Sequence, residues 1–226
     1  LRDGSACGAS LTVTIWRPNP EFAPIAERVA AGDESIIFEC ASHSIKVPAK
    51  HRLVVIGATE LASTLTRTAR ACDFRVTIVD PRPAFATHRR QPHADALIVG
   101  WPQDELPGLL DPADAVVVLA HDVKIDLPAL RCALASKVRY IGALGNRRTQ
   151  QARREALIAL GYTEAGLARI HGPVGLDLGA TTNAQIACSI LAEILSVLND
   201  RSALPLRETA APIGPSPALA ENETFL

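Results

Sequence analysis

Short apolar runs alternate with helix-patterned segments through the middle of this chain, and this alternation restricts the fold more than any other feature. Continuous β-branched runs such as Val116-Val117-Val118 suit strands that are covered on both faces, which is typical of a parallel sheet. The pattern therefore predicts an α/β fold built on a doubly wound parallel sheet. The expected strands run from Leu53 to Ile56, Arg75 to Asp80, Ala96 to Gly100, Ala115 to Leu119 and Val138 to Ala143, and the expected helices between them include Glu60 to Ala71 and Leu127 to Ala135.

Two more helices are expected after the fifth strand. Asn146 is a suitable N-cap for a helix from Arg147 to Leu160, which Gly161 would end. Thr182 and Gln185 have the spacing of a capping box, and apolar residues at helical spacing follow them. The sequence thus predicts a last amphipathic helix beginning after Thr182.

Segments of different character flank this sheet domain, which we expect at residues 51–203. Residues 1–50 read as a small α+β segment, with a short helix between strands at Leu11 to Trp16 and Ile36 to Glu39. Residues 204–226 combine four prolines with small and polar residues, so we expect a disordered C-terminal tail.

The charge balance narrows the possible partners. The 226 residues carry 23 Lys and Arg against 24 Asp and Glu, a net charge of −1, which argues against a nucleic-acid or acidic-membrane binder. No apolar run approaches the roughly 18 residues of a membrane span. The five cysteines are odd in number and contain no C-x-x-C pair, which favours a reducing cytoplasm over a disulfide framework or a zinc site.

The turn after the first strand of the sheet resembles a dinucleotide-binding turn. Gly57 and Ala62 match the first and third positions of G-x-G-x-x-G/A, with Ala58 between strand and helix, but Thr59 and Glu60 bring bulk and negative charge to the expected phosphate site. Asp80 ends the next strand, where an acidic side chain would accept hydrogen bonds from a ribose. Alternatively, Gly57 and Ala62 serve only the packing of helix on sheet.

The strand order predicts where a ligand would bind. In the order third, second, first, fourth, fifth, the switch point lies between the first and fourth strands, outside their carboxyl ends. His121 and Asp122 follow the fourth strand, so His121 should face Thr59 and Glu60 across this crevice. His121 is therefore the preferred functional histidine, and the alternative is that it only orients the loop with Asp122.

A possible anion site follows the fifth strand. The helix start at Asn146 carries Arg147, Arg148 and the hydroxyl of Thr149, and a helix N-terminus with guanidinium groups suits a phosphate. Alternatively, the two arginines form a solvated face paired with Glu155.

A glycine-rich loop from Gly172 to Gly179 is a further candidate. It contains Asp177, which we expect to be a buried carboxylate. Such loops often approach a ligand or another chain closely, although a tight internal turn has the same composition.

Several of these motifs together resemble the XdhC/CoxI family, accessory proteins of molybdenum hydroxylases such as xanthine dehydrogenase. Ala6-Cys7-Gly8-Ala9 is similar to the family's Cys-Gly-Gly segment, at the end of its N-terminal domain. Thr59, Glu60 and Asn146 stand where the family usually has Gly, His and Ser. The other matching segments are Val54 to Ala58, Phe74 to Pro83, His121-Asp122 with Ile125 to Leu130, Tyr140 to Thr149, and Arg169 to Leu195.

The resemblance implies a function in cofactor maturation. Family members bind molybdenum cofactor, assist its sulfuration and insert it into the apoenzyme, so the implied partners are a molybdenum hydroxylase and a cysteine desulfurase, with a homodimer as a further expectation. The implied cofactor-binding residues are Cys7, Gly57, Ala58, Asp80, His121, Asp122, Asn146, Arg147, Arg148 and Asp177, with no catalytic residue and no resident metal. Residues 1–50 would then be the end of the family's N-terminal domain in a chain that continues upstream of Leu1.

Two other functions stay open. Gly57 and Asp80 are compatible with an NAD(P)-dependent oxidoreductase, which Thr59, Glu60 and the lack of a recognisable substrate domain oppose. A remnant that retains the fold without a ligand is the third possibility.

Overall fold

The computed structural model describes residues 50–110 and 115–210, the backbone of 36–40 and 43–47, and the single positions 24, 27 and 213. The chain divides into two compact units, Leu1–Ala49 and Lys50–Leu226. In the first unit, strands β1 (Ile36–Cys40) and β2 (His43–Val47) pair antiparallel. β1 confirms the strand expected there and β2 was not predicted, while the strand expected at 11–16 lies outside the described residues.

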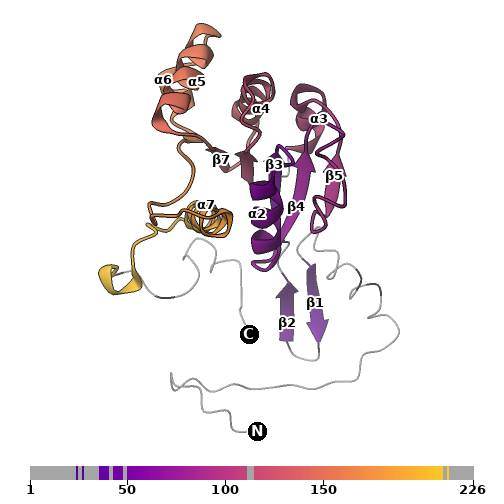
Figure 1. Ribbon diagram of the computed structural model, residues 1–226. Coiled ribbons are helices and arrows are strands. Elements are labelled where there is room, and N and C mark those ends of the chain that lie inside the picture. The colour runs from indigo at the N-terminus through magenta and orange to yellow at the C-terminus, as the bar shows by residue number, and fades with distance from the viewer. Residues whose placement is uncertain are drawn as a thin grey trace. The chain divides into compact units, whose positions relative to one another are not determined.

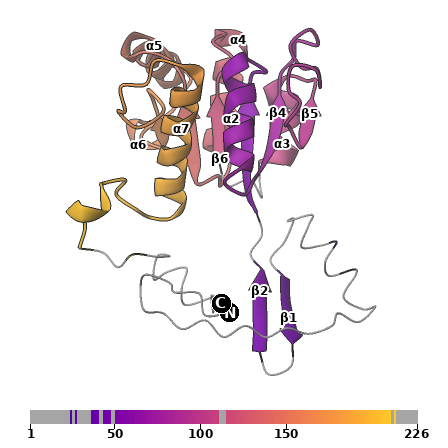
Figure 2. The same cartoon turned by 60° about the horizontal axis from the view of Figure 1, so that its bottom comes forward.

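The second unit is built on a six-stranded parallel sheet (Figures 1 and 2). Its strand order is β5-β4-β3-β6-β7-β8, which confirms the doubly wound topology and the switch point between β3 and β6. β8 was not predicted, because its two residues are too few to show the alternation of apolar and polar side chains that marks a strand. The strands are β3 (His51–Ile56), β4 (Phe74–Val79), β5 (Ala96–Ile98), β6 (Ala115–Val118), β7 (Tyr140–Ala143) and β8 (Ile170–His171).

Helices cover both faces of this sheet. Figure 2 shows α2 (Glu60–Arg70) and α7 (Asn183–Leu198) side by side on one face, and α3 (Pro102–Leu109), α4 (Val123–Ala135) and α5 (Arg147–Ala159) pack on the other. The short helix α6 (Glu164–Leu167) precedes β8, and a 3₁₀ helix (Leu206–Glu208) lies within the tail that was expected to be disordered. Within the described residues, no helix has the length and apolar character that crossing a membrane requires.

Successive side chains of β3 point to opposite faces of the sheet, so the strand contributes to a separate hydrophobic core on each face. Leu53 and Val55 point to the α2–α7 side, whereas Val54 and Ile56 point to the α3–α5 side, and all four are at most 2% exposed. Every residue of β6 is buried, as its β-branched run predicts. The central strands β3 and β6 are therefore covered on both faces, and their ends are the parts that a polar ligand can approach.

Side-chain caps fix where the helices start at the carboxyl end of the sheet. Asn146 caps α5 as predicted, and Thr182 with Gln185 forms the predicted capping box of α7. α4 begins one turn earlier than predicted because the Asp122 carboxylate accepts a hydrogen bond from the N–H of Lys124.

Candidate functional site

A crevice of about 420 Å³ lies where the carboxyl ends of β3, β6 and β7 meet. The loop after β6 contributes His121, which lines the same crevice as Thr59 and Glu60, in the arrangement that the strand order predicts. The full lining is Thr59, Glu60, Leu61, His121, Leu144, Gly145, Asn183 and Ile186.

Gly57 is required by the close approach of another loop. Its φ is +101°, and a Cβ atom on it would lie 2.6 Å from the Cα of Ala120, in the loop that follows β6. The next residue, Ala58, is fully buried. Packing inside the protein therefore explains the glycine at position 57 without a bound pyrophosphate.

The Asp80 carboxylate is hydrogen-bonded to other residues of the protein. It accepts hydrogen bonds from the N–H of Ala58 at 2.7 Å and from the backbone and guanidinium of Arg82 at 2.7–2.9 Å. Burial alone would raise the pKa of this carboxyl, but the bonds from Arg82 and Ala58 outweigh it and hold the pKa below its ordinary value. Asp80 thus ties the turn after β3 to the end of β4.

Asp80→Asn is expected to lower the free energy of unfolding at pH 7 by about 2 kcal/mol, because it weakens hydrogen bonds to a charged group. The folded-state pKa of Asp80 is lowered, so its contribution is fully present above the unfolded pKa of about 3.9 and is lost as the pH falls below it. Urea unfolding of both proteins between pH 7 and pH 3 tests this. A difference that does not narrow toward low pH would contradict it.

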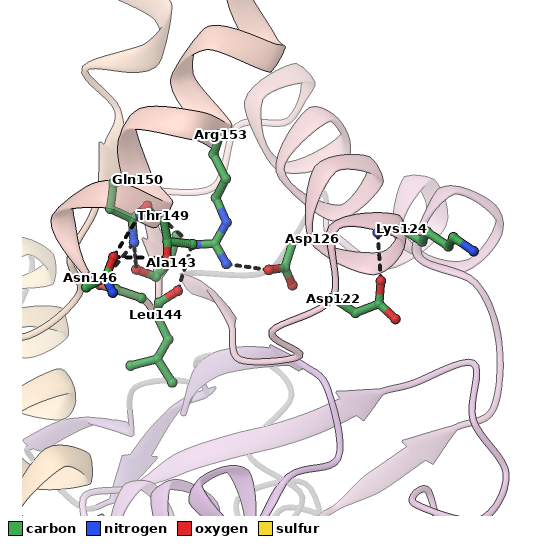
Figure 3. Close-up of polar contacts among 10 residues, drawn as sticks. Asp122, Lys124, Asp126, Ala143, Leu144, Asn146, Thr149, Gln150 and Arg153 are labelled. Carbon is green, nitrogen blue, oxygen red and sulfur yellow. Dashed lines mark hydrogen bonds and ion pairs between the residues drawn. The ribbon is translucent and has the colours of Figure 1, made fainter.

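His121 and Asp122 have separate positions at the start of α4. His121 is exposed and has a φ of +56°, a left-handed conformation that histidine adopts more readily than most residues and that often occurs at functional sites. The Asp122 side chain caps α4 (Figure 3), whereas His121 forms no part of this cap.

The helix start after β7 presents two arginines to solvent. Asn146, Arg147 and Arg148 are exposed, and no carboxylate of the described residues pairs with either arginine, since Glu155 bonds Gln151 instead. Arg147 lines a separate hollow of about 500 Å³ that extends to Gly172 and Pro173. The hydroxyl of Thr149, named above as part of the possible anion site, donates to the Asn146 side chain at 3.1 Å (Figure 3).

The expectation of a buried carboxylate at Asp177 is wrong, because this residue is exposed and lines none of the hollows described in this subsection. The partly buried acceptor beside this loop is Glu193 of α7, which accepts from the N–H of Gly175 at 2.7 Å. Gly175 has a φ of +104°, and a Cβ atom there would lie 2.5 Å from the Ser189 hydroxyl. The glycine-rich loop is therefore a tight turn packed against α7.

The Glu193 carboxylate also contacts two side chains from the neighbouring strands β7 and β8. Tyr140 donates its hydroxyl at 2.6 Å, and Nδ1 of His171 lies 3.0 Å from the carboxylate. Burial would raise the pKa of Glu193, but the bonds from His171 and Tyr140 hold it below its ordinary value. Sequence reasoning missed this cluster, because its members come from three separate elements.

Sequence reasoning also missed a buried ion pair between α4 and α5. Arg153 reaches from α5 to Asp126 on α4 (Figure 3), and their side chains are 7% and 3% exposed. Arg153 also donates to the carbonyl of Leu144 at 2.6 Å. Burial raises the pKa of the Asp126 carboxyl, and the Arg153 guanidinium offsets only part of that effect.

This ion pair faces a second hollow, of about 300 Å³, between α4 and α5. His121 lines both this hollow and the crevice, so the two adjoin at that side chain. The available sequence signal was a carboxylate among the apolar residues Ile125, Ala129 and Leu130 of an otherwise buried helix face.

Comparison with known proteins places this geometry in a family. A family model described as the XdhC Rossmann domain matches residues 53–194. A Bacillus subtilis protein named as a probable component of xanthine dehydrogenase is 32% identical over 151 residues, which cover 66% of this chain and 44% of that protein. The Escherichia coli molybdenum cofactor insertion chaperone PaoD is 39% identical over 88 residues, which cover 39% of this chain and 28% of PaoD.

A solved structure agrees with these relatives. The crystal structure of a xanthine dehydrogenase from Bacillus halodurans superposes with a TM-score of 0.60 at 27% identity, covering 74% of this chain and 47% of that one. This chain therefore spans less than half the length of each of these three relatives. The matched range contains the whole parallel sheet from Leu53 onward and the crevice at its carboxyl end, and the chain belongs to the XdhC family through this Rossmann domain.

Proposed function

We propose that this chain is an accessory protein that binds molybdenum cofactor, assists its sulfuration and inserts it into a xanthine dehydrogenase-type hydroxylase. The observation that carries the proposal is the XdhC Rossmann match over residues 53–194, because that range includes every residue of the crevice. The relative named as a molybdenum cofactor insertion chaperone supports the same role. The proposed partners are the apoenzyme and a cysteine desulfurase that supplies the sulfur.

The residues at the carboxyl end of the sheet fit a pterin cofactor with a terminal phosphate. The crevice offers the imidazole of His121 beside apolar walls, and the first turn of α5 adds the positive end of a helix dipole with the exposed residues Arg147 and Arg148. Cys7, the proposed soft ligand for the molybdenum-sulfur centre, lies outside the described residues. No nucleophile, base and orienting group come together among these residues, so the proposed work is binding and transfer.

The nicotinamide alternative finds less support in this geometry. Asp80 would have to accept hydrogen bonds from a ribose, but its carboxylate is fully buried and already accepts four. Glu60 also adds a negative charge to the crevice where a pyrophosphate would bind.

Anaerobic titration separates the two functions. The protein is titrated with isolated molybdenum cofactor and, in parallel, with NAD and NADH. We expect molybdenum to remain with the protein through gel filtration, measured by elemental analysis, and the nicotinamides to give no saturable signal. Micromolar binding of a nicotinamide without retention of molybdenum would overturn the proposal.

His121→Asn is expected to weaken cofactor retention about tenfold or more. The change removes an imidazole from the crevice, and one hydrogen bond to a charged group is worth about 1.5 kcal/mol. Asparagine tolerates the left-handed backbone at this position, so the melting temperature should change little. His88→Asn, at an exposed histidine outside the crevice, is the matched control. Equal retention by both variants would remove His121 from the site.

A further inference from the structure

The Asp126–Arg153 pair is left incomplete by the protein around it. Oδ2 of Asp126 accepts from Arg153, but Oδ1 is buried and receives no hydrogen bond from any residue that the structure describes. An ionised carboxylate has about four acceptor positions, and buried polar atoms normally find partners. Asp126 is 2% exposed, so bulk water does not meet this need. The free acceptor therefore suits a donor that binds in the hollow that Asp126 lines.

Stability alone gives no reason for this pair. Apolar residues of similar volume generally stabilise a core as well as a buried ion pair does, or better. Arg153 is held firmly, because it also donates to the Leu144 carbonyl and to Oε1 of Gln150 at 3.3 Å. The guanidinium thus fixes one carboxylate oxygen of Asp126 in place and leaves the other free to accept (Figure 3).

The hollow beside the pair has the character of a small-molecule site. Its walls are apolar side chains from α4 and α5, namely Val123, Leu127, Ala152 and Ala156, and its polar groups are His121, Asp126, Thr149 and Arg153. Ligand sites commonly combine such walls with a few convergent polar groups, and about 300 Å³ is the lower limit of their volume. The space between the two helices therefore suits one ring system.

We propose that this hollow binds the aminopyrimidinone ring of a pterin, with Oδ1 of Asp126 accepting a hydrogen bond from the ring's 2-amino group. The proposal rests on the proposed function, to which it adds the place and the polar partner of the pterin ring. Because His121 lines both the hollow and the crevice, the remainder of the molecule would extend past His121 toward the crevice.

The first test changes the ligand and leaves the protein intact. Free pterin and lumazine, which has an oxo group in place of the 2-amino group, are titrated separately into the full chain and followed by their own fluorescence. We expect saturable binding of pterin and at least tenfold weaker binding of lumazine, because lumazine places an acceptor near Oδ1. Equal affinities, or no saturable binding of either compound, would overturn the proposal.

Guanine carries the same amino and ring N–H edge as pterin, so guanosine forms a third arm of this titration. Tighter binding of guanosine than of pterin would assign the hollow to a guanine nucleotide and contradict a pterin site.

The second test fills the hollow without touching the ion pair. Ala156→Leu adds a larger side chain to the wall on α5 and is expected to weaken pterin binding at least tenfold. Ala159→Leu makes the same change at an exposed position of α5 outside the hollow and should bind pterin as the unmodified chain does. Equal binding by the two variants, with unchanged melting temperatures, would place the ring elsewhere.

The outcomes separate this inference from the proposed function. Retention of molybdenum cofactor without discrimination between pterin and lumazine would overturn the ring site alone. Discrimination between the two rings without retention of the cofactor would instead support the ring site and contradict the maturation role.

Discussion

Arg153→Met is expected to lower the free energy of unfolding by about 3–5 kcal/mol, because it leaves the Asp126 carboxylate buried without a counter-charge. Asp126→Leu should lower the free energy of unfolding by a similar amount, since it leaves the buried guanidinium of Arg153 without a counter-charge. Urea unfolding followed by circular dichroism measures both. Arg148→Met, at an exposed arginine of the same helix, should stay within about 0.5 kcal/mol of the unmodified chain.

The double variant Asp126→Leu with Arg153→Met tests whether the ion pair makes a net contribution to the stability of the fold. Removing both charges leaves no unpaired ion, so we expect it to regain most of the stability that each single change loses. A double variant as unstable as the sum of the two single ones would show that the residues act independently. If the double variant is stable, its loss of pterin discrimination can be assigned to the lost acceptor and not to unfolding.

The sheet was predictable because its information is local. The central strand β6 is a β-branched run, Val116-Val117-Val118, that is buried on both faces, and strands alternating with helices permit few topologies. The caps at Asn146 and Thr182 were readable for the same reason, since each bonds a backbone N–H three residues away. α3 was missed because Pro107 and Gly108 interrupt its helical pattern.

The chemistry of the site depends on pairings that no local pattern contains. Asp126 and Arg153 are 27 residues apart, and nothing in either helix indicates which charged residue will meet the other. Asp80 has the position of a ribose acceptor, but whether it stays free depends on how Arg82 folds back on it. Asp177 was expected to be buried because glycines surround it, whereas burial depends on packing against α7. The sequence thus located the crevice but not the partners of its polar groups.

Gly57→Ala is expected to lower the free energy of unfolding by about 2–5 kcal/mol, the sum of a left-handed backbone cost of about 1–2 kcal/mol and an overpacking cost of about 1–3 kcal/mol. The new methyl group would meet the backbone of Ala120, which cannot rotate away as a flexible side chain can. Gly161→Ala is the matched control, because Gly161 also has a positive φ, +91°, but nothing lies within 4 Å of its added Cβ. It should show the backbone cost alone.

The difference between these two variants isolates the contact between the turn after β3 and the loop after β6. That loop carries His121, so we expect relief of the clash in Gly57→Ala to displace the side chain shared by the crevice and the hollow. Cofactor retention should therefore fall in Gly57→Ala and persist in Gly161→Ala at a temperature where both are folded. Equal stability losses would contradict the close packing at Gly57. Equal retention despite a larger loss would mean that the turn supports the fold but does not position His121.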